Sequence, residues 1–205
     1  HRPFTYPAGR IDIPSPGGRL GAVKYTDWAI GDFIRKASAH PWFGETLFVI
    51  VADHCASAAG KTRLPLDRYH IPAIFYAPGM LKPGTYDRIA SQIDLAPTLV
   101  DLLGKAGDTL FFGESLFENS GGSARAFVSN FQELGYFKGG ILTVLRPRGE
   151  VEAQRIDPVT LSGTPTPINP AFRDEAVAYY QTAARAFKQG ALISPDHRIP
   201  PEVIR

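Results

Sequence analysis

Glu45-Thr-Leu-Phe-Val-Ile-Val-Ala-Asp53-His54 is the stretch that decides the fold of this 205-residue chain. Its middle, residues 47–52, is an unbroken apolar run rich in β-branched and aromatic residues. This pattern is typical of a strand buried on both faces of a parallel sheet. Ligands of open α/β sheets bind outside the carboxyl ends of the strands. Asp53 and His54 end the run, so they fall where chemistry is expected.

The side chains of Asp53 and His54 suggest a metal site. A carboxylate oxygen and an imidazole nitrogen together suit a divalent cation such as Zn²⁺ or Mn²⁺. The pair supplies half of a four-ligand shell, so further ligands have to come from elsewhere. A structural alternative stays open, in which Asp53 caps the following turn and His54 is a partly buried imidazole with satisfied hydrogen bonds.

The composition is that of an ordinary globular domain, with 44% hydrophobic and 20% charged residues. A formal net charge of +2 without a run of five or more like charges argues against a nucleic-acid partner. No stretch approaches the ~18 consecutive apolar residues of a membrane helix, so we expect a soluble chain. Cys55 is the only cysteine, which excludes an internal disulfide. It fits better as a small residue in a tight turn than as a nucleophile.

The sequence around the central run predicts helices that flank a sheet. The first 21 residues hold four prolines and four glycines and predict a loop. Apolar residues recur at helical spacing over 22–37, which predicts an amphipathic helix. Residues 70–79 predict a second strand that ends in a Pro-Gly turn. A short helix is expected over 92–104, with Asp94 as its cap.

The remaining part of the chain predicts an antiparallel addition to that sheet. Residues 124–129 and 150–156 are strand-like, and 135–145 predict a hairpin with Lys-Gly-Gly at its tip. A final helix is expected over 170–189. The predicted fold is therefore α/β, with a central mostly parallel sheet flanked by helices and a small antiparallel C-terminal sheet.

A loop ending in Gly-Lys-Thr follows Cys55 and is similar to a phosphate-binding P-loop. The P-loop needs a glycine where this chain has Cys55. Pro65 also stands where the helix of a P-loop would continue. We therefore do not expect a nucleotide site. Two interpretations stay open for Lys61, a cation facing an anion in the mouth of the metal site or a solvated loop lysine.

His70, at the start of the second strand, also has two interpretations. If that strand runs parallel to the first, His70 lies at the opposite end from Asp53. If the strands are antiparallel, or the loop before His70 folds back, the imidazole can reach the metal site. The structural alternative is a histidine hydrogen-bonded to nearby backbone.

Taken together, seven stretches resemble the second half of the sulfatase-like domain in lipoteichoic acid synthase-type proteins, which belong to the alkaline phosphatase superfamily. The stretches are residues 1–7, 24–31, 48–54, 70–72, 76–79, 91–98 and 112–113. The resemblance implies an alkaline phosphatase-like sandwich, present as a partial domain. It covers most of residues 1 to about 145 and fades beyond about 150. We therefore expect the C-terminal half of a sulfatase-like domain over 1–150 and an extension with one helix over 151–205.

The resemblance also implies roles for individual residues. Asp53 and His54 would ligate the catalytic divalent metal, Mn²⁺ or Zn²⁺, with Mg²⁺ and Ca²⁺ as further candidates. His1 would contact the substrate head group, although Arg2 interrupts the family's Asn-His-Phe-Pro-like motif at this point. Lys61 and His70 would be further substrate-binding residues. The family's threonine nucleophile and acidic metal ligand lie earlier in the domain, so no catalytic nucleophile is expected in this chain.

The function implied by the resemblance is that of a larger metal-dependent hydrolase or phosphotransferase, of which this chain is the C-terminal portion. Its substrates would be anionic phospholipid head groups of the phosphoglycerol or phosphoethanolamine type, or sulfate or phosphate esters. The larger enzyme would be tethered to the cytoplasmic membrane, with its catalytic domain in the periplasm. The alternative is an inert structural or binding fragment that lacks the nucleophile.

Overall fold

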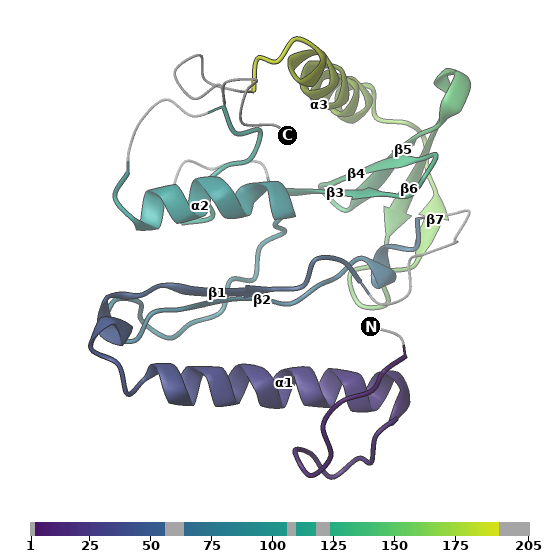
Figure 1. Ribbon diagram of the computed structural model, residues 1–205. Coiled ribbons are helices and arrows are strands. Elements are labelled where there is room, and N and C mark those ends of the chain that lie inside the picture. Colours follow the sequence, from purple (N-terminus) through teal and green to yellow (C-terminus); the bar gives the residue numbers. More distant parts are fainter. Residues whose placement is uncertain (1–2, 56–63, 106–109, 118–123, 193–205) are drawn as a thin grey trace, which may run out of the picture. The chain divides into compact units, whose positions relative to one another are not determined.

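The structure is a computed structural model that describes residues 3–55, 64–105, 110–117 and 124–192 (Figure 1). The chain divides into two units. The first consists of His1–Val51 and Pro72–Thr85, and the second of Ala52–Ile71 and Tyr86–Arg205. The chain therefore leaves the first unit after Val51, one residue before the apolar run ends, and Asp53 and His54 belong to the second unit.

The first unit contains a long helix and two short strands. They are α1 (Gly18–Ala37), the 3₁₀ turn η1 (Pro41–Glu45), β1 (Phe48–Val51) and β2 (Ala73–Tyr76). The expected helix is confirmed, but α1 begins four residues before residue 22. Tyr6 explains the glycine at position 21, because a Cβ there would collide with the Tyr6 hydroxyl. That hydroxyl also donates to the carbonyls of Ile13 and Pro14.

β1 and β2 form a two-stranded antiparallel sheet, with Phe48 opposite Tyr76 and Val51 opposite Ala73. The expected central, mostly parallel sheet is wrong for the described ranges, in which every pair of neighbouring strands is antiparallel. The apolar run marked a strand correctly. The expected burial on both faces is wrong, because three residues of β1 are half-buried and Val51 is exposed. An apolar run also carries no information on the direction of the neighbouring strand.

Aromatic rings join α1 to the sheet of the first unit. Phe48 of β1 lies with its ring centroid 5.9 Å from that of Phe33 on α1 and 5.3 Å from that of Phe43 in η1. Tyr76 of β2 adds a contact to Phe48 at 6.1 Å. Even so, Phe33 remains 54% exposed and Tyr76 37% exposed. The ring contacts therefore connect α1, η1 and the two strands, but they do not form a buried core in this unit.

The second unit contains a five-stranded antiparallel meander, which confirms the predicted addition. Its strands are β3 (Arg125–Ser129), β4 (Leu134–Lys138), β5 (Ile141–Leu145), β6 (Val151–Ile156) and β7 (Gly163–Pro165), in this order across the sheet. Gly139 and Gly140 form the tip of the β4–β5 hairpin, both at positive φ, as the Lys-Gly-Gly motif predicts.

Helices and a small apolar core complete the second unit. α3 (Pro170–Lys188) packs against β4 and β5, and the 3₁₀ turn η3 (Gln92–Asp94) leads directly into α2 (Leu95–Leu102). Two further 3₁₀ turns are η2 (Leu66–Arg68) and η4 (Pro147–Gly149). The core is formed by buried aliphatic residues of η2, the turn before it and the sheet, namely Leu64, Leu66, Val128, Leu142, Val144 and Ile156.

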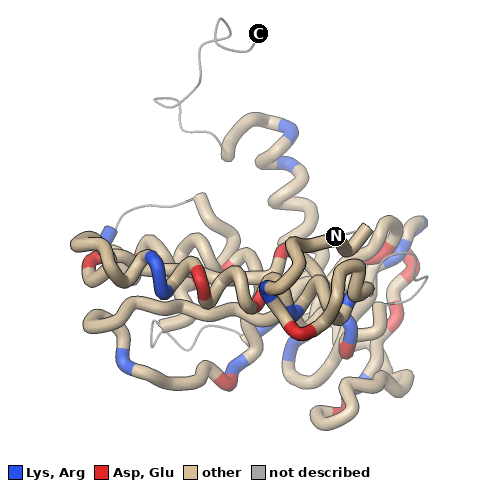
Figure 2. Tube along the Cα trace, turned by 60° about the horizontal axis from the view of Figure 1, so that its bottom comes forward, with Lys and Arg blue, Asp and Glu red and all other residues tan. Residues whose placement is uncertain are grey.

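Charged residues are dispersed along the described chain, with basic and acidic segments interspersed (Figure 2). On α1, for example, Asp32 pairs with Arg35 at 2.6 Å and with Lys36 at 2.7 Å. Among the described helices, none is both long and apolar enough to cross a bilayer.

β6 belongs to the same sheet as β5, so the sheet continues past residue 150. The expected division into 1–150 and 151–205 stays a prediction.

Candidate metal centre

Asp53 and His54 follow the end of β1 and present their side chains to solvent. The side chain of Asp53 is 88% exposed and that of His54 is 78% exposed. This exposure does not match the structural alternative in which His54 is a partly buried imidazole. Both side chains are accessible to an ion or a substrate.

Backbone groups contact one polar atom of each of the two side chains. Asp53 Oδ1 accepts a hydrogen bond from the backbone N–H of His54 at 2.9 Å. His54 Nδ1 lies 2.8 Å from the carbonyl oxygen of Cys55. Because a carbonyl oxygen only accepts, Nδ1 is the protonated nitrogen and the lone pair of the neutral ring lies on Nε2. The remaining atoms, Asp53 Oδ2 and His54 Nε2, are 3.6 Å apart.

This arrangement fits two ligands of one divalent cation. Two donors about 2.0–2.2 Å from the same ion lie roughly 3.0–3.6 Å apart when their angle at the ion is about 90–120°. The backbone contact on the opposite ring nitrogen is also the usual way in which a protein orients a metal-ligating histidine. Among the described residues no group of three or more His, Cys, Asp or Glu side chains could hold a metal ion. The described part of the chain therefore offers two ligands.

The side chain of Gln92 contacts the same segment, which the sequence did not predict. Gln92 Nε2 donates to the carbonyl oxygen of Ala52 at 3.1 Å and to that of Asp53 at 2.9 Å. Gln92 is the first residue of η3, which begins with a capping box formed by Ser91 and Asp94. The Ser-x-x-Asp spacing before an apolar helix indicates this cap. No sequence pattern indicates what the glutamine between them contacts.

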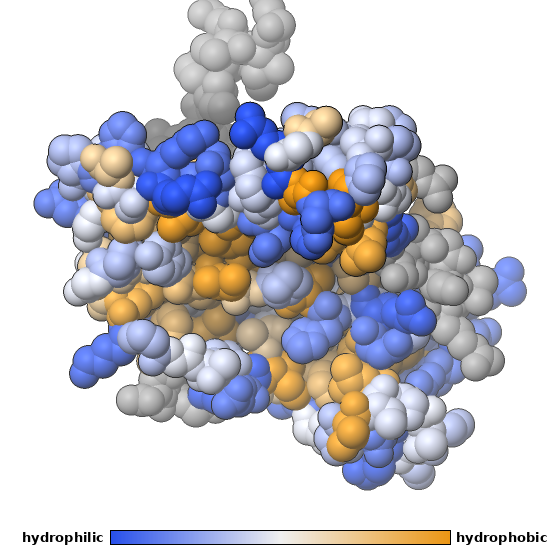
Figure 3. Space-filling view, turned by 90° about the horizontal axis from the view of Figure 1, so that it is seen from below, coloured by the Kyte–Doolittle hydropathy of each residue, from blue (hydrophilic) through white to orange (hydrophobic). Residues whose placement is uncertain are grey.

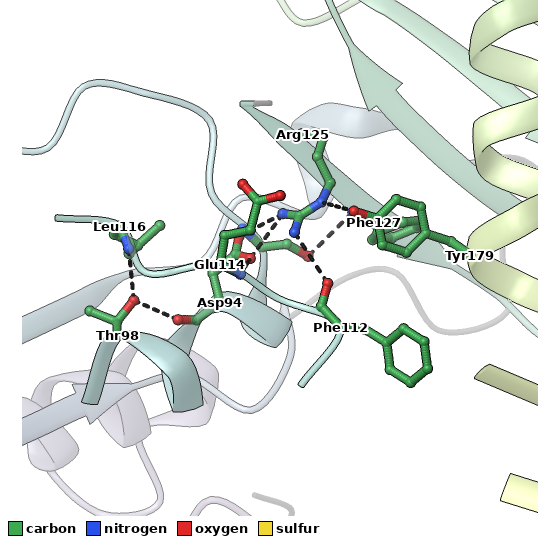
Figure 4. A network of polar contacts seen from close by, with 9 residues as sticks. Asp94, Thr98, Phe112, Glu114, Leu116, Arg125, Phe127 and Tyr179 are labelled. Atoms are coloured by element: carbon green, nitrogen blue, oxygen red, sulfur yellow. Dashed lines mark hydrogen bonds and ion pairs between the residues drawn. The ribbon is translucent and has the colours of Figure 1, made fainter. Parts of the chain in front are cut away.

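A buried ion pair fixes the position of η3 (Figure 4). Arg125 Nη1 donates to both carboxylate oxygens of Asp94 at 2.9 Å, and the two side chains are only 2–3% exposed. The Asp94 carboxylate also accepts from the backbone N–H of Ser91 at 2.8 Å and of Glu114 at 3.0 Å. Asp94 was predicted as a helix cap. Its carboxylate closes the capping box of η3, in which Ser91 is the N-cap and Asp94 the third helical residue, but it makes no cap hydrogen bond at the start of α2. It also pairs with a buried arginine.

Arg125 stays charged although it is buried. Burial by itself lowers the pKa of Arg125, but the hydrogen bond with Tyr179 and the charge of Asp94 outweigh it, so the pKa is raised. Tyr179 comes from α3, and its hydroxyl oxygen accepts from Arg125 Nε at 3.4 Å. The guanidinium therefore joins β3, η3 and α3 in one polar network, as Figure 4 shows.

Of the other predicted site residues, His70 is among the described residues. His70 is exposed and precedes β2 by three residues. β1 and β2 are antiparallel, so the chain enters β2 at the end of that sheet at which it leaves β1, and the register runs as far as Val51 opposite Ala73. This is the arrangement in which the sequence analysis allowed His70 to reach the metal site. His1, Lys61 and the Gly-Lys-Thr loop lie outside the described residues.

This chain is similar to known proteins both in sequence and in structure. The family model described as "Sulfatase" matches residues 2–105. A solved structure of a protein in the alkaline phosphatase superfamily from Vibrio parahaemolyticus is similar over 93% of this chain, with 32% sequence identity and a TM-score of 0.86. The similarity covers 47% of that protein, so this chain spans about half of its length. Both matches agree with the superfamily that the sequence motifs indicated.

Proposed function

The chain belongs to the sulfatase family, and on this premise we propose that it supplies the metal-binding part of an enzyme that hydrolyses or transfers phosphate or sulfate esters. One observation carries the proposal. Asp53 Oδ2 and His54 Nε2 are free of other partners in the described structure, solvent-accessible and 3.6 Å apart, while backbone groups hold the other polar atom of each side chain.

Each of the two residues supplies one ligand to a divalent ion, for which we propose Mn²⁺ or Zn²⁺. Asp53 supplies a negative charge through Oδ2, and His54 supplies a neutral nitrogen donor whose tautomer is fixed by the carbonyl of Cys55. When bound, such an ion lowers the pKa of a hydroxyl nucleophile and stabilises negative charge on the ester. We assign no residue of this chain as the nucleophile, which the proposal places in another part of the enzyme.

The substrate we propose is an ester of the phosphoglycerol or phosphoethanolamine type, or a sulfate ester. The resemblance of residues 1–7 and 91–98 to lipoteichoic acid synthase-type proteins supports the phosphodiester class. His1, Lys61 and His70 are the proposed substrate-binding residues, and the antiparallel register of β1 and β2 supports His70. A membrane-tethered enzyme with a periplasmic catalytic domain is the setting in which phospholipid head groups would be met.

The test uses the complete natural protein with Asp53→Asn and His54→Gln substitutions. We expect bound Mn²⁺ or Zn²⁺ to fall below stoichiometric, and turnover of bis(p-nitrophenyl) phosphate or p-nitrophenyl sulfate to drop at least about 100-fold, because the reacting charge loses its stabilisation. Elemental analysis and initial rates measure the two effects. Asp174→Asn and His40→Gln, which change exposed residues elsewhere, are the matched controls.

Two results would speak against the proposal. If Asp53→Asn retained the metal content and turnover of Asp174→Asn, Asp53 would not be a ligand. If the complete wild-type protein bound metal but turned over neither ester class, the structural or binding alternative would be favoured over the enzyme.

A further inference from the structure

Gln92 is the residue that connects the candidate metal ligands to the interior of the second unit. Its side-chain amide reaches two consecutive carbonyls, those of Ala52 and Asp53, at 3.1 and 2.9 Å. Both carbonyls lie beyond Val51, the last residue of β1. The amide nitrogen carries two hydrogens, so one side chain can satisfy both acceptors at once.

Contacts on both sides of Gln92 keep its backbone in place. Ser91 and Asp94 close the capping box around it. The hydroxyl oxygen of Ser91 accepts from the backbone N–H of Phe127 on β3 at 3.3 Å, and Asp94 is held by Arg125. Gln92 therefore extends from a rigid, buried support toward an exposed segment. Fixed groups of this kind position ligands more accurately than a free loop does.

Fixing the Asp53 carbonyl also restrains its carboxylate. The backbone N–H of His54 belongs to the same peptide group as the Asp53 carbonyl, and this N–H donates to Asp53 Oδ1. A rotation of that peptide would move the N–H away and release the carboxylate. By holding the carbonyl, Gln92 opposes the rotation and keeps Oδ2 near His54 Nε2.

We propose that Gln92 is a positioning residue for the metal centre, acting on Asp53 through the peptide that joins Asp53 to His54. The metal part of this inference rests on the proposed function. The backbone part does not, because the hydrogen bonds of Gln92 hold the peptide whether or not an ion is bound. The two parts are therefore tested separately.

The variant for both tests is Gln92→Met, which keeps the approximate size of the side chain, removes the amide and adds no charge. Gln132→Met is the matched control, since Gln132 is exposed in the turn between β3 and β4 of the same unit. In the first test, Mn²⁺ binding is measured by isothermal titration of the complete natural protein. We expect at least about 10-fold weaker binding for Gln92→Met, the usual effect of losing an outer-shell partner, and unchanged binding for Gln132→Met.

The second test measures amide hydrogen exchange by NMR in metal-free protein. We expect the His54 amide to exchange several-fold faster in Gln92→Met, while the Tyr136 amide on β4 keeps its rate. Unchanged exchange at His54, or equally increased exchange at His54 and Tyr136, would overturn the positioning role, because the second result would mean general loosening of the unit. If wild-type protein bound neither Mn²⁺ nor Zn²⁺ and His54 exchange still rose in the variant, the proposed function would fail and the backbone role of Gln92 would stand.

Discussion

At the scale of single residues, the charge pair of Asp94 and Arg125 is buried on both sides. Both side chains are almost completely removed from water, so neither can be hydrated if its partner is lost. Attraction between such charges offsets the cost of burying them only when every polar atom is satisfied. Here the carboxylate accepts from two backbone N–H groups in addition to the guanidinium, which meets that condition.

Arg125→Met should therefore lower the free energy of unfolding by about 3–5 kcal/mol, because it leaves the Asp94 carboxylate buried without a counter-charge. Urea denaturation at neutral pH measures the loss. The double variant Asp94→Asn/Arg125→Met, which removes both charges, should recover part of it. A single variant as stable as the wild type would show that the pair is unimportant for folding.

At the scale of elements, the close approach of the segment 112–116 to η3 depends on a glycine. A Cβ at Gly113 would overlap the backbone of Ile93 and crowd the N–H of Asp94. Without the Cβ, the backbone N–H of Glu114 comes within 3.0 Å of Asp94 Oδ1. The backbone N–H of Leu116 likewise donates to Thr98 Oγ1 at 3.0 Å, which ties the segment to α2. The glycine is thus needed for packing between elements.

Gly113→Ala should destabilise the protein by about 1–3 kcal/mol, the usual cost of forcing extra volume into a packed contact. Thermal unfolding followed by circular dichroism would detect it. Gly44→Ala is the control, since a Cβ at Gly44 meets open space and its φ is not positive. Equal midpoints for the two variants would contradict the close contact.

The elements also show which features of the fold can be derived from sequence. Periodicity located α1, α3 and the β4–β5 hairpin to within a few residues, because each is determined by neighbours along the chain. The antiparallel pairing of β1 with β2 was not predicted, since it depends on the path that the chain takes between the two strands.

Among the candidate site residues, Asp53 and His54 were proposed from their place after a strand. Gln92 was not, because its contact with Asp53 joins residues 39 positions apart.

At the scale of the whole chain, the first unit exposes much of its apolar surface. Its described buried hydrophobic residues are only Tyr6, Ala37 and Ala77. By contrast, large hydrophobic residues of α1, η1, β1 and β2 and of the turn after β2 are exposed, namely Leu20, Val23, Phe33, Trp42, Val51, Ile74, Tyr76 and Met80. Viewed from the α1 side, hydrophobic residues gather between hydrophilic ones over much of the surface (Figure 3). Exposed apolar area of this extent promotes association.

Ile74→Lys on β2 should reduce that tendency at little cost in stability. Ile74 is 52% exposed, so little burial is lost, and surface substitutions usually change stability by less than about 0.5 kcal/mol. We expect weaker binding of the dye ANS and less self-association in analytical ultracentrifugation. The control is Val128→Lys in the core of the second unit, which should prevent folding. A large stability loss from Ile74→Lys would mean that this position is buried in solution.

The contact between Gln92 and Asp53 also has a consequence for the order of events during synthesis. Asp53 and His54 leave the ribosome well before Gln92, and Arg125, which holds η3, follows Asp94 by a further 31 residues. Until that arginine has emerged and docked, η3 lacks the ion pair that holds it, and the contact of Gln92 with the Asp53 carbonyl lacks its support. If Asp53 and His54 bind a divalent ion as proposed, a nascent chain should hold that ion firmly only after β3 has formed.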